Sequence, residues 1–385
     1  MGKSPLILAA LASDAVPGLV IKKATSLSDD TAGSFDSAVI TDDSGEHYIV
    51  RIPSSPAAGA ELELELKVIK SLSSFATRLG FEIPKPVGET RDAVGNRVMV
   101  FKFVYGNKID ANRVAPASAL SHSIAKSMSA IHSLPLELVQ SAGLPEFSPA
   151  ENIRVRVSEL DRAAQTGKVP SVLLTRWEQA LEDVALFRYQ PTVVHGALSG
   201  DSMLEQDNAI SGVIDWKNLQ INDPAVDFAW LMPTEHHELI DAVILNYQLA
   251  RGNSDSALGL RAILYSELEL AKWLLHGFSR RNSEIVEDAV QMLSGLAEQA
   301  AAGELTPLTQ EQRAQLATPI ANPLADEEYE TISLDPTEGE VEMEVITVSS
   351  GPIVHAENDL ETGEDYATKN VQTQPIDIVK DADLF

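Results

Sequence analysis

Short apolar runs separated by polar turns mark the N-terminal part of the chain and predict strands at residues 35–51 and 97–104. In the first stretch, apolar runs on both sides of the polar segment Asp42–Gly45 are typical of a β-hairpin. Between the two stretches, Ala57–Ser73 carries apolar residues at intervals of three and four, which predicts a helix. The N-terminal part is therefore expected to be rich in strands.

Apolar positions change to a helical period after about residue 105. The segment Ile124–Ile131 has one apolar face and belongs to a predicted helix that Pro135 closes, and Ala257–Phe278 predicts a longer amphipathic helix. We therefore expect an α+β protein in which a small strand-rich lobe, residues 1–105, precedes a larger helical lobe, residues 106–302.

One pair of strands interrupts the predicted helical lobe. Pro191–Leu198 and Ile210–Trp216 are apolar runs with a polar turn between them, and we expect them to form a hairpin. Asp215, near the end of the second strand, is by position either a metal ligand or a structural cap. Further on, Asp223 is the expected N-cap of a helix whose first residue is Pro224.

Composition and charge narrow the classes of protein. The 385 residues include 57 acidic and 29 basic side chains, a net charge of −28, and 44% of them are hydrophobic. This hydrophobic content can form a sizeable core, which excludes a wholly disordered chain. So large an excess of negative charge repels the phosphates of nucleic acids and anionic lipids, so neither nucleic acid nor a membrane is an expected partner.

The negative charge is concentrated at the C-terminal end. Residues 326–385 contain seventeen acidic residues and two lysines, and their apolar residues show no sustained helical period. Such a segment cannot bury enough apolar area to offset its ordering entropy, so we expect a disordered acidic tail after a linker at residues 303–325. The tail is either simply solvated or binds a protein partner, for example by adding Val341–Val348 as a strand to that partner's sheet.

The chain contains no cysteine, which excludes a thiolate nucleophile, a disulfide framework and cysteine-bound zinc. Lys3 followed by the apolar stretch Pro5–Ala12 only faintly resembles a secretory leader, because the stretch is short and has a single positive charge. No window is apolar enough for a membrane helix. We therefore expect a cytoplasmic protein.

Three motifs in order, with a further pair upstream, resemble a known family. The motifs are His195-Gly196-x-Leu198, Ile214-Asp215-Trp216 and Asp223-Pro224-Ala225-x-Asp227-Phe228-Ala229, with Gly33-Ser34-Phe35-Asp36-Ser37-x-Val39 and Tyr48-Ile49-Val50-Arg51-Ile52-Pro53 upstream. The first three resemble the catalytic block of the aminoglycoside phosphotransferase family, and most of all of its macrolide phosphotransferase branch, and the upstream pair resembles the nucleotide loop and third strand of that branch. The resemblance covers roughly residues 1–300 and implies a bacterial protein with a bilobal, protein-kinase-like fold.

The resemblance also implies a phosphoryl transfer from ATP or GTP with Mg²⁺ to the hydroxyl of a small molecule. Asp215 occupies the position of the family's magnesium ligand, a hard oxygen donor that suits this ion. Arg51 occupies the strand position where kinases generally keep a phosphate-binding lysine, and its guanidinium can contact phosphate with a different geometry. Glu65, in the helix after that strand, is the expected partner of Arg51; the alternative is a solvated glutamate.

Other positions follow from the same resemblance. Phe101 and Phe103 belong to the expected connection between the lobes, whose backbone would meet a purine; the alternative is an ordinary strand that leads into a loop. Asp227 is expected to accept hydrogen bonds from the loop of His195, a structural role, as is the cap at Asp223. The hydroxyl acceptor is expected among helices of the second lobe, near Trp230, Glu267, Glu269 and Trp273.

The catalytic loop departs from the family pattern. In the family, the loop reads His-Gly-Asp with an Asn five residues later; the Asp receives the proton of the acceptor hydroxyl and the Asn holds metal. Here these positions are Ala197 and Ser202, after His195, and Asp201 is the neighbouring carboxylate that stands closest in sequence to either role. Alanine cannot accept a proton, and a positioned general base is worth about a hundredfold to ten-thousandfold in rate.

Two classes of function therefore remain open. The first is a small-molecule kinase with impaired turnover. The second is a pseudokinase-like module that binds a nucleotide or a protein partner without turnover. The retained Asp215 together with the lost carboxylate at Ala197 favours binding over turnover.

Overall fold

The computed structural model describes residues 3–27, 34–309 and 312, which belong to one compact unit, residues 1–321. The predicted acidic tail with its Val341–Val348 segment, most of the predicted linker, and Gly33 of the predicted nucleotide loop lie outside the described residues.

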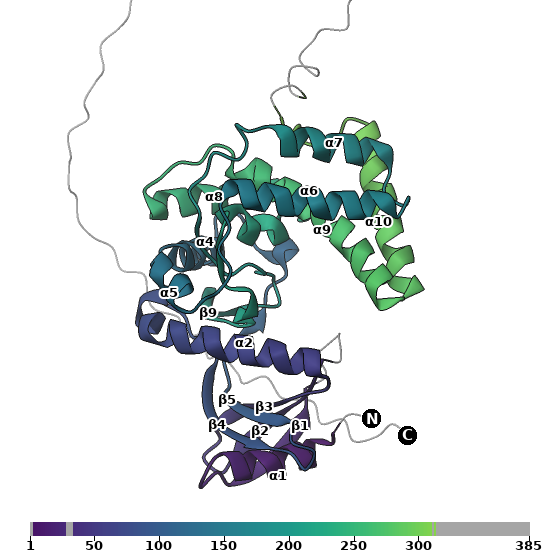
Figure 1. Ribbon diagram of the computed structural model, residues 1–385. Coiled ribbons are helices and arrows are strands. Elements are labelled where there is room, and N and C mark those ends of the chain that lie inside the picture. Colours follow the sequence, from purple (N-terminus) through teal and green to yellow (C-terminus); the bar gives the residue numbers. More distant parts are fainter. Residues whose placement is uncertain (1–2, 28–33, 310–311, 313–385) are drawn as a thin grey trace, which may run out of the picture. The chain divides into compact units, whose positions relative to one another are not determined.

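The N-terminal part is a five-stranded antiparallel sheet of order β1-β2-β3-β5-β4 (Figure 1). The predicted hairpin is present: Asp36 lies opposite Ile52 and Thr41 opposite His47, on either side of a turn at Asp42. Strand β5 then pairs with both β3 and β4. The bounds are β1 Ile21–Ser26, β2 Phe35–Asp42, β3 His47–Pro53, β4 Lys85–Arg91 and β5 Arg97–Lys102.

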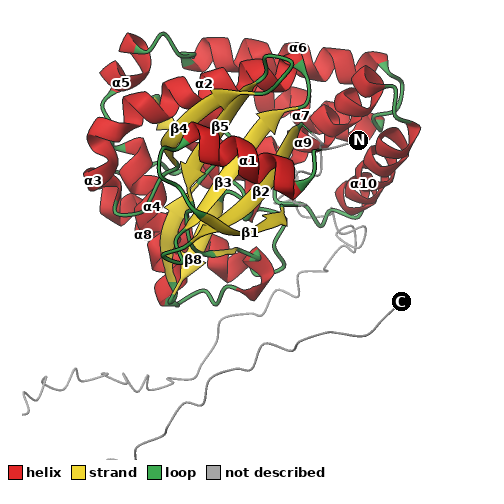
Figure 2. Cartoon of the chain, turned by 90° about the horizontal axis from the view of Figure 1, so that it is seen from below, coloured by secondary structure: helices red, strands yellow, loops and turns green. Residues whose placement is uncertain are grey.

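A helix covers each face of this sheet. Because side chains alternate along a strand, Val50 and Ile52 point to the face covered by α1 (Pro5–Ala15), and Arg51 between them points to the other face. That other face packs on α2 (Pro56–Leu72), which confirms the helix predicted there within one residue at each end. Figure 2 shows α1 lying across the strands.

Helix α1 and strands β1 and β4 were not anticipated from the sequence. The segment that faintly resembled a leader forms α1: Ser4 caps its N-terminus, Pro5 starts it, and buried Leu8 and Ala12 pack on the sheet. Its apolar residues are thus part of the core of the first lobe.

The second lobe is mainly helical, as predicted. Its core contains fully buried Trp177, Trp216, Phe228 and Leu264. The longer helices are α4 Ala119–His132, α5 Leu136–Ser141, α6 Pro149–Gln165, α7 Ser171–Glu182, α8 His237–Arg251, α9 Leu258–Arg280 and α10 Ser283–Ala301; short ones are η1 Ser73–Phe75, α3 Ala76–Leu79, η2 Ala111–Arg113, η3 Trp216–Asn218 and η4 Pro224–Leu231.

The predicted hairpin between residues 191–198 and 210–216 is wrong. Strand β7 (Thr192–Val194) pairs with β10 (Gln220–Asn222), and β9 (Ala209–Val213) pairs with β8 (Met203–Gln206), which in turn pairs with β6 (Asn107–Lys108). The reason is local: β8 and β9 are separated by the two-residue turn Asp207–Asn208, both in left-handed conformation, so they form the hairpin themselves.

The two lobes touch through α2 and through the end of α3. Helix α2 contacts η3, which directly follows Asp215. The backbone of Glu82 forms hydrogen bonds with Ser211 and Val213, of 2.8 and 2.9 Å, so this segment extends β9 by a parallel bridge. Among the described residues, no helix is both long and apolar enough to cross a membrane.

Candidate active site

The loop between β7 and β8 carries the motif of His195, and a buried carboxylate fixes its start. Asp227 accepts hydrogen bonds from the backbone amides of His195 and Gly196, both 2.8 Å long, as expected from the sequence. Gly196 has φ +83, and a Cβ there would collide with the carbonyl oxygen of Asn218. Only glycine therefore fits this position of the loop.

Asp227 is fully buried and has a third partner, Nε2 of His132 at 3.0 Å. Burial alone would raise the pKa of Asp227, but the hydrogen bonds and charge interactions, foremost with His132, hold it below its ordinary value of 3.8. Nδ1 of His132 in turn contacts the hydroxyl of Tyr247 at 2.8 Å. A buried chain of polar groups thus connects α8, α4 and the loop.

The lowered pKa of Asp227 predicts a pH dependence of stability. Because its pKa is lower in the folded protein than in the unfolded chain, the ionised carboxylate stabilises the fold above pH 3.8, and this contribution is lost as the pH falls through the folded value. We expect the difference in unfolding free energy between the wild type and Asp227→Asn to shrink below pH 3.8. Urea unfolding of dilute protein from pH 7 to 3 measures it, and a difference independent of pH would contradict the assignment.

His195 itself is a structural residue of the loop. Its side chain is fully buried, its Nε2 lies 3.0 Å from the carbonyl oxygen of Ile214, and its ring packs edge-on against Trp216 at 4.7 Å. Burial lowers the pKa of its imidazole below the ordinary value. The neutral ring therefore braces the loop against the segment that carries Asp215.

Asp215 lies directly after β9 and has a left-handed backbone, φ 67 and ψ 51, which aspartate tolerates better than most residues. Its side chain is 42% exposed, and Oδ1 lies 3.2 Å from Nζ of Lys217. Lys217 also contacts Glu61 of α2, at 3.4 Å. Burial alone would lower the pKa of Lys217, but the two carboxylates raise it above the ordinary value, so the lysine is charged.

The ion pair predicted between Arg51 and Glu65 is present. Nη1 of Arg51 lies 3.0 Å from Oε2 of Glu65, and the guanidinium also lies 4.1 Å from the centre of the Phe35 ring. Burial raises the pKa of Glu65; Arg51 opposes this shift, and the negative charge of Asp215 adds to it. Arg51 and Glu65 are therefore in the same electrostatic neighbourhood as Asp215.

Three segments that are distant in sequence thus meet beside α2. The sheet contributes Arg51, α2 contributes Glu61 and Glu65, and the segment after β9 contributes Asp215 and Lys217. We name these five residues the charge cluster. It holds two cations and three carboxylates at the contact between the lobes.

The remaining loop residues lie as follows. Ala197 is half-buried and offers only a methyl group. Asp201 is exposed, its side chain 78% accessible, and it pairs with Lys108 at 3.2 Å. Ser202 is 3% exposed, and its hydroxyl accepts a 2.8 Å hydrogen bond from the amide of Ser199 and donates one of 3.1 Å to the carbonyl oxygen of the same residue.

These positions bear on a magnesium site. The carboxylate of Asp215 fits the ion, because magnesium is commonly held by one or two carboxylates together with substrate phosphates and waters. The hydroxyl of Ser202 fits less well, since it already closes the loop on Ser199, although the backbone places Ser202 opposite Ile214 through a 2.9 Å hydrogen bond. In the part of the chain that the structure describes, no three His, Asp or Glu side chains are grouped to hold a metal.

In the connection between the lobes, backbone groups that were expected to meet a purine are paired within the protein. The side chain of Phe101 is buried under α2, and its backbone lies within the sheet between Ile49 and Pro86. The amide of Phe103 donates to the carbonyl oxygen of His47 at 3.1 Å. The alternative interpretation, a strand that leads into a loop, fits Phe101, and the amide of Phe103 is already used.

The predicted acceptor residues do not form one site. Glu267 is buried and accepts two hydrogen bonds from Arg176, of 2.9 and 2.8 Å, and one of 2.8 Å from Trp177. It joins α9 to α7 and is not free for a substrate, so its prediction is wrong. Glu269 pairs with Lys272 one turn along the same helix.

Only one of the four predicted acceptor residues contacts the loop. The ring of Trp230 lies against Gly200, whose added Cβ would be 3.8 Å from it, and its indole nitrogen is buried without a hydrogen-bond partner in the described part of the chain. Trp273 instead donates to Asp288 of α10, at 2.8 Å. Of the four, Trp230 is therefore the one that lies beside the loop.

Sequence reasoning missed Lys217 and the role of Glu61. A weak signal existed for both, since Lys217 lies two residues after Asp215 and Glu61 lies one helical turn before Glu65. It also missed the partner of Asp223: this buried cap accepts from the amide of Ala225 at 2.9 Å, as expected for an N-cap, and additionally from Arg261 at 2.7 Å.

Known proteins are similar to this chain in sequence and in fold. The family model described as the phosphotransferase enzyme family matches residues 32–262. A viomycin phosphotransferase from Streptomyces vinaceus is 26% identical over 247 residues, which are 61% of this chain and 79% of that protein.

Two solved structures share the fold. A macrolide 2'-phosphotransferase type I superposes with a TM-score of 0.64 at 23% identity, over 75% of this chain and 96% of its own. The GDP complex of an aminoglycoside 2'-phosphotransferase-IIIa gives 0.65 at 20% identity, over 78% and 100%. The predicted bilobal, protein-kinase-like α+β fold is thereby confirmed.

Proposed function

We propose a function that starts from the family: this chain belongs to the phosphotransferase enzyme family. In this proposal it binds a purine nucleotide and transfers a phosphoryl group from it to the hydroxyl of a small molecule. The transfer is slow because Ala197 provides no carboxylate to accept the proton of that hydroxyl. The observation that carries this proposal is the charge cluster. It places Arg51, held by Glu65, in the same electrostatic neighbourhood as the half-exposed Asp215.

The chain's own residues have distinct tasks in this proposal. Phosphoryl transfer depends mostly on positioning and on neutralising charge. Arg51 binds a phosphate, and Glu65 orients its guanidinium while the Phe35 ring limits its movement. Bound magnesium, held by Asp215, would neutralise charge on the phosphates, and Lys217 supplies a further positive charge beside it.

The acceptor side of the site is incomplete. Ala197 cannot take the proton of the acceptor hydroxyl, and Asp201 is the exposed carboxylate of the same loop. It pairs with Lys108 at 3.2 Å, and a carboxylate of this loop is the group that could accept the proton. The relatives found act, by their names, on viomycin, macrolides and aminoglycosides, so a bulky natural product with hydroxyl groups is the proposed class of acceptor.

One specific observation favours a second candidate function, a nucleotide-binding module without turnover. The loop lacks the carboxylate at Ala197, and the hydroxyl of Ser202 is spent on Ser199. Both positions that would complete catalysis are therefore without a reactive group, whereas Asp215 is retained and Arg51 keeps a positive charge at the position of the lysine. Measured turnover distinguishes the two candidates.

Nucleotide binding provides the direct test. We expect the full-length protein to bind ATP or GTP with magnesium in titration calorimetry, and we expect Asp215→Asn to weaken this binding more than Asp201→Asn. The reason is that Asp215 lies in the charge cluster, whereas Asp201 is exposed and pairs only with Lys108 among the described residues. Asp201→Asn is the matched control, because it makes the same change in charge elsewhere in the site. Equal affinities for the wild type and the Asp215 variant would remove the metal role of Asp215.

A further inference from the structure

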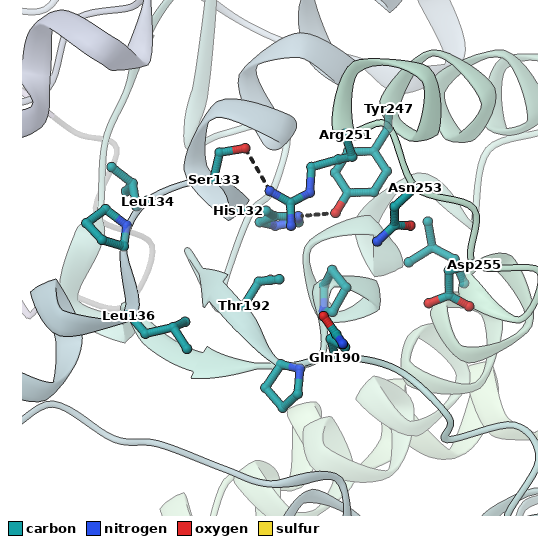
Figure 3. A pocket seen from close by; sticks show the side chains of 14 residues that line it. His132, Ser133, Leu134, Leu136, Gln190, Thr192, Tyr247, Arg251, Asn253 and Asp255 are labelled. Carbon is teal, nitrogen blue, oxygen red and sulfur yellow. Dashed lines mark hydrogen bonds between the residues drawn. The ribbon is translucent and has the colours of Figure 1, made fainter.

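A cavity of about 350 Å³ lies in the second lobe, and its lining includes neither the charge cluster nor residues 195–202 (Figure 3). Its walls come from the end of α4 and the start of α5 (132–136), from residues 190–192 at the start of β7, from Pro224, and from Tyr247–Leu258 between α8 and α9. This volume lies within the usual range of small-molecule pockets, about 300–1,000 Å³.

The guanidinium of Arg251 is the charged group of this cavity. Its Nη1 donates to the hydroxyl of Ser133 at 2.7 Å, and its Nε is buried without a hydrogen-bond partner within residues 3–27, 34–309 and 312. No carboxylate in the described part of the chain lies within ion-pair distance of it. A buried guanidinium nitrogen that lacks an acceptor is costly, so an acceptor from outside the chain would be stabilised here.

A second donor lines the same cavity. Thr192 is 9% exposed, and its hydroxyl has no hydrogen-bond partner among the residues that the structure describes. Figure 3 shows Arg251 and Thr192 around the same opening as the amides of Gln190 and Asn253. Nε of Arg251 and the hydroxyl of Thr192 can therefore both donate a hydrogen bond to a ligand.

Two other ionisable side chains of the cavity, Asp255 and His132, already have hydrogen-bond partners. Asp255 accepts two hydrogen bonds from Arg261, of 3.2 and 2.6 Å, and one from the amide of Ala257, of 3.1 Å. Both ring nitrogens of His132 are engaged, with Tyr247 and with Asp227. Neither of these side chains needs a ligand.

We propose that this cavity binds a small acid, whose carboxylate or phosphate group is held by Arg251 and Thr192. The planar fork of arginine matches two oxygens of such a group, and a threonine hydroxyl can donate to a third acceptor or the same oxygen. The size of the cavity restricts the ligand to a small molecule.

The bound acid would lie next to the catalytic loop. His132, which lines the cavity, contacts Asp227 at 3.0 Å, and Asp227 accepts the amides of His195 and Gly196. Only two side chains therefore separate the ligand from the loop. The proposal does not depend on the proposed function, because the cavity and its donors are independent of the charge cluster.

The experiment measures the thermal stability of the full-length protein, without nucleotide or magnesium, in inorganic phosphate and in succinate, with sodium chloride at equal ionic strength as the reference. A ligand that binds only the folded state raises the melting temperature. We expect a rise with at least one of the two acids, and the arm that responds identifies the phosphate or the carboxylate as the preferred group.

Variants assign the rise to the cavity. Thr192→Val keeps the shape and removes the hydroxyl, and we expect it to weaken binding; Arg251→Met should weaken it at least tenfold, and Arg251→Lys less. Arg51→Met controls for phosphate bound at the charge cluster and should leave the rise unchanged. No rise with either acid, or a rise that is lost in Arg51→Met and kept in Thr192→Val and Arg251→Met, would overturn the proposal.

Discussion

Replacing Ala197 by aspartate should raise nucleotide turnover about a hundredfold or more, and adding Ser202→Asn should bring the gain to about two to four powers of ten. The change places a carboxylate at the position where the family's proton acceptor stands, and positioned general bases contribute factors of this size. Ala197 is half-buried next to the loop's exposed Asp201, so a larger side chain can reach solvent there.

The two substitutions are expected to differ in their effect on turnover. Ser202 is buried and its hydroxyl accepts from the amide of Ser199, so Ser202→Asn must repack the loop to keep that amide satisfied. We therefore expect Ala197→Asp alone to give most of the gain. Hydrolysis of ATP and GTP to inorganic phosphate measures turnover without knowledge of the acceptor.

Ala197→Asn is the matched control, because it has the shape of aspartate and cannot accept a proton as a carboxylate does. Its turnover should stay at the level of the wild type. If the wild type already turns over nucleotide as fast as the double variant, the hypothesis of impaired catalysis is contradicted. The proton acceptor would then be Asp201 or another group. Asp201→Asn in the wild type then tests that role.

Local sequence patterns were sufficient for the elements whose contacts are local. The hairpin at Asp42–Gly45 and helix α2 follow from a polar turn and a helical period, and the cap at Asp223 follows from the proline after it. The fold was predicted in another way, from the family resemblance of three motifs that contain His195, Asp215 and Asp227 in this order.

What the sequence could not reveal depends on pairing across the fold. Strand β7 has three residues, and its partner β10 is chosen by packing around buried Val193 and Ile221 rather than by any turn between them. Glu267 was expected near the hydroxyl acceptor, yet it accepts hydrogen bonds from Arg176, 91 positions away. Such partners become visible only when distant segments are placed side by side.

The same limitation hid the buried ion pairs that hold the second lobe together. Arg261 of α9 is fully buried and donates to Asp223 at 2.7 and 3.1 Å and to Asp255 at 3.2 and 2.6 Å. Tyr265, one turn along the helix, donates to Asp223 at 2.7 Å. Burial alone would lower the pKa of Arg261, but Asp223 and Asp255 raise it, so the group is charged.

Arg261→Met should therefore destabilise the protein by about 3–5 kcal/mol, the usual cost when one partner of a buried ion pair is removed. The cost arises because methionine fills most of the space but leaves Asp223 fully buried without its cation. Lys272→Met is the matched control on the same helix: its pair with Glu269 is largely exposed, and such pairs contribute about 0–1 kcal/mol. Urea unfolding followed by tryptophan fluorescence measures both, and similar losses for the two variants would show that the buried pair does not carry the stability of this lobe.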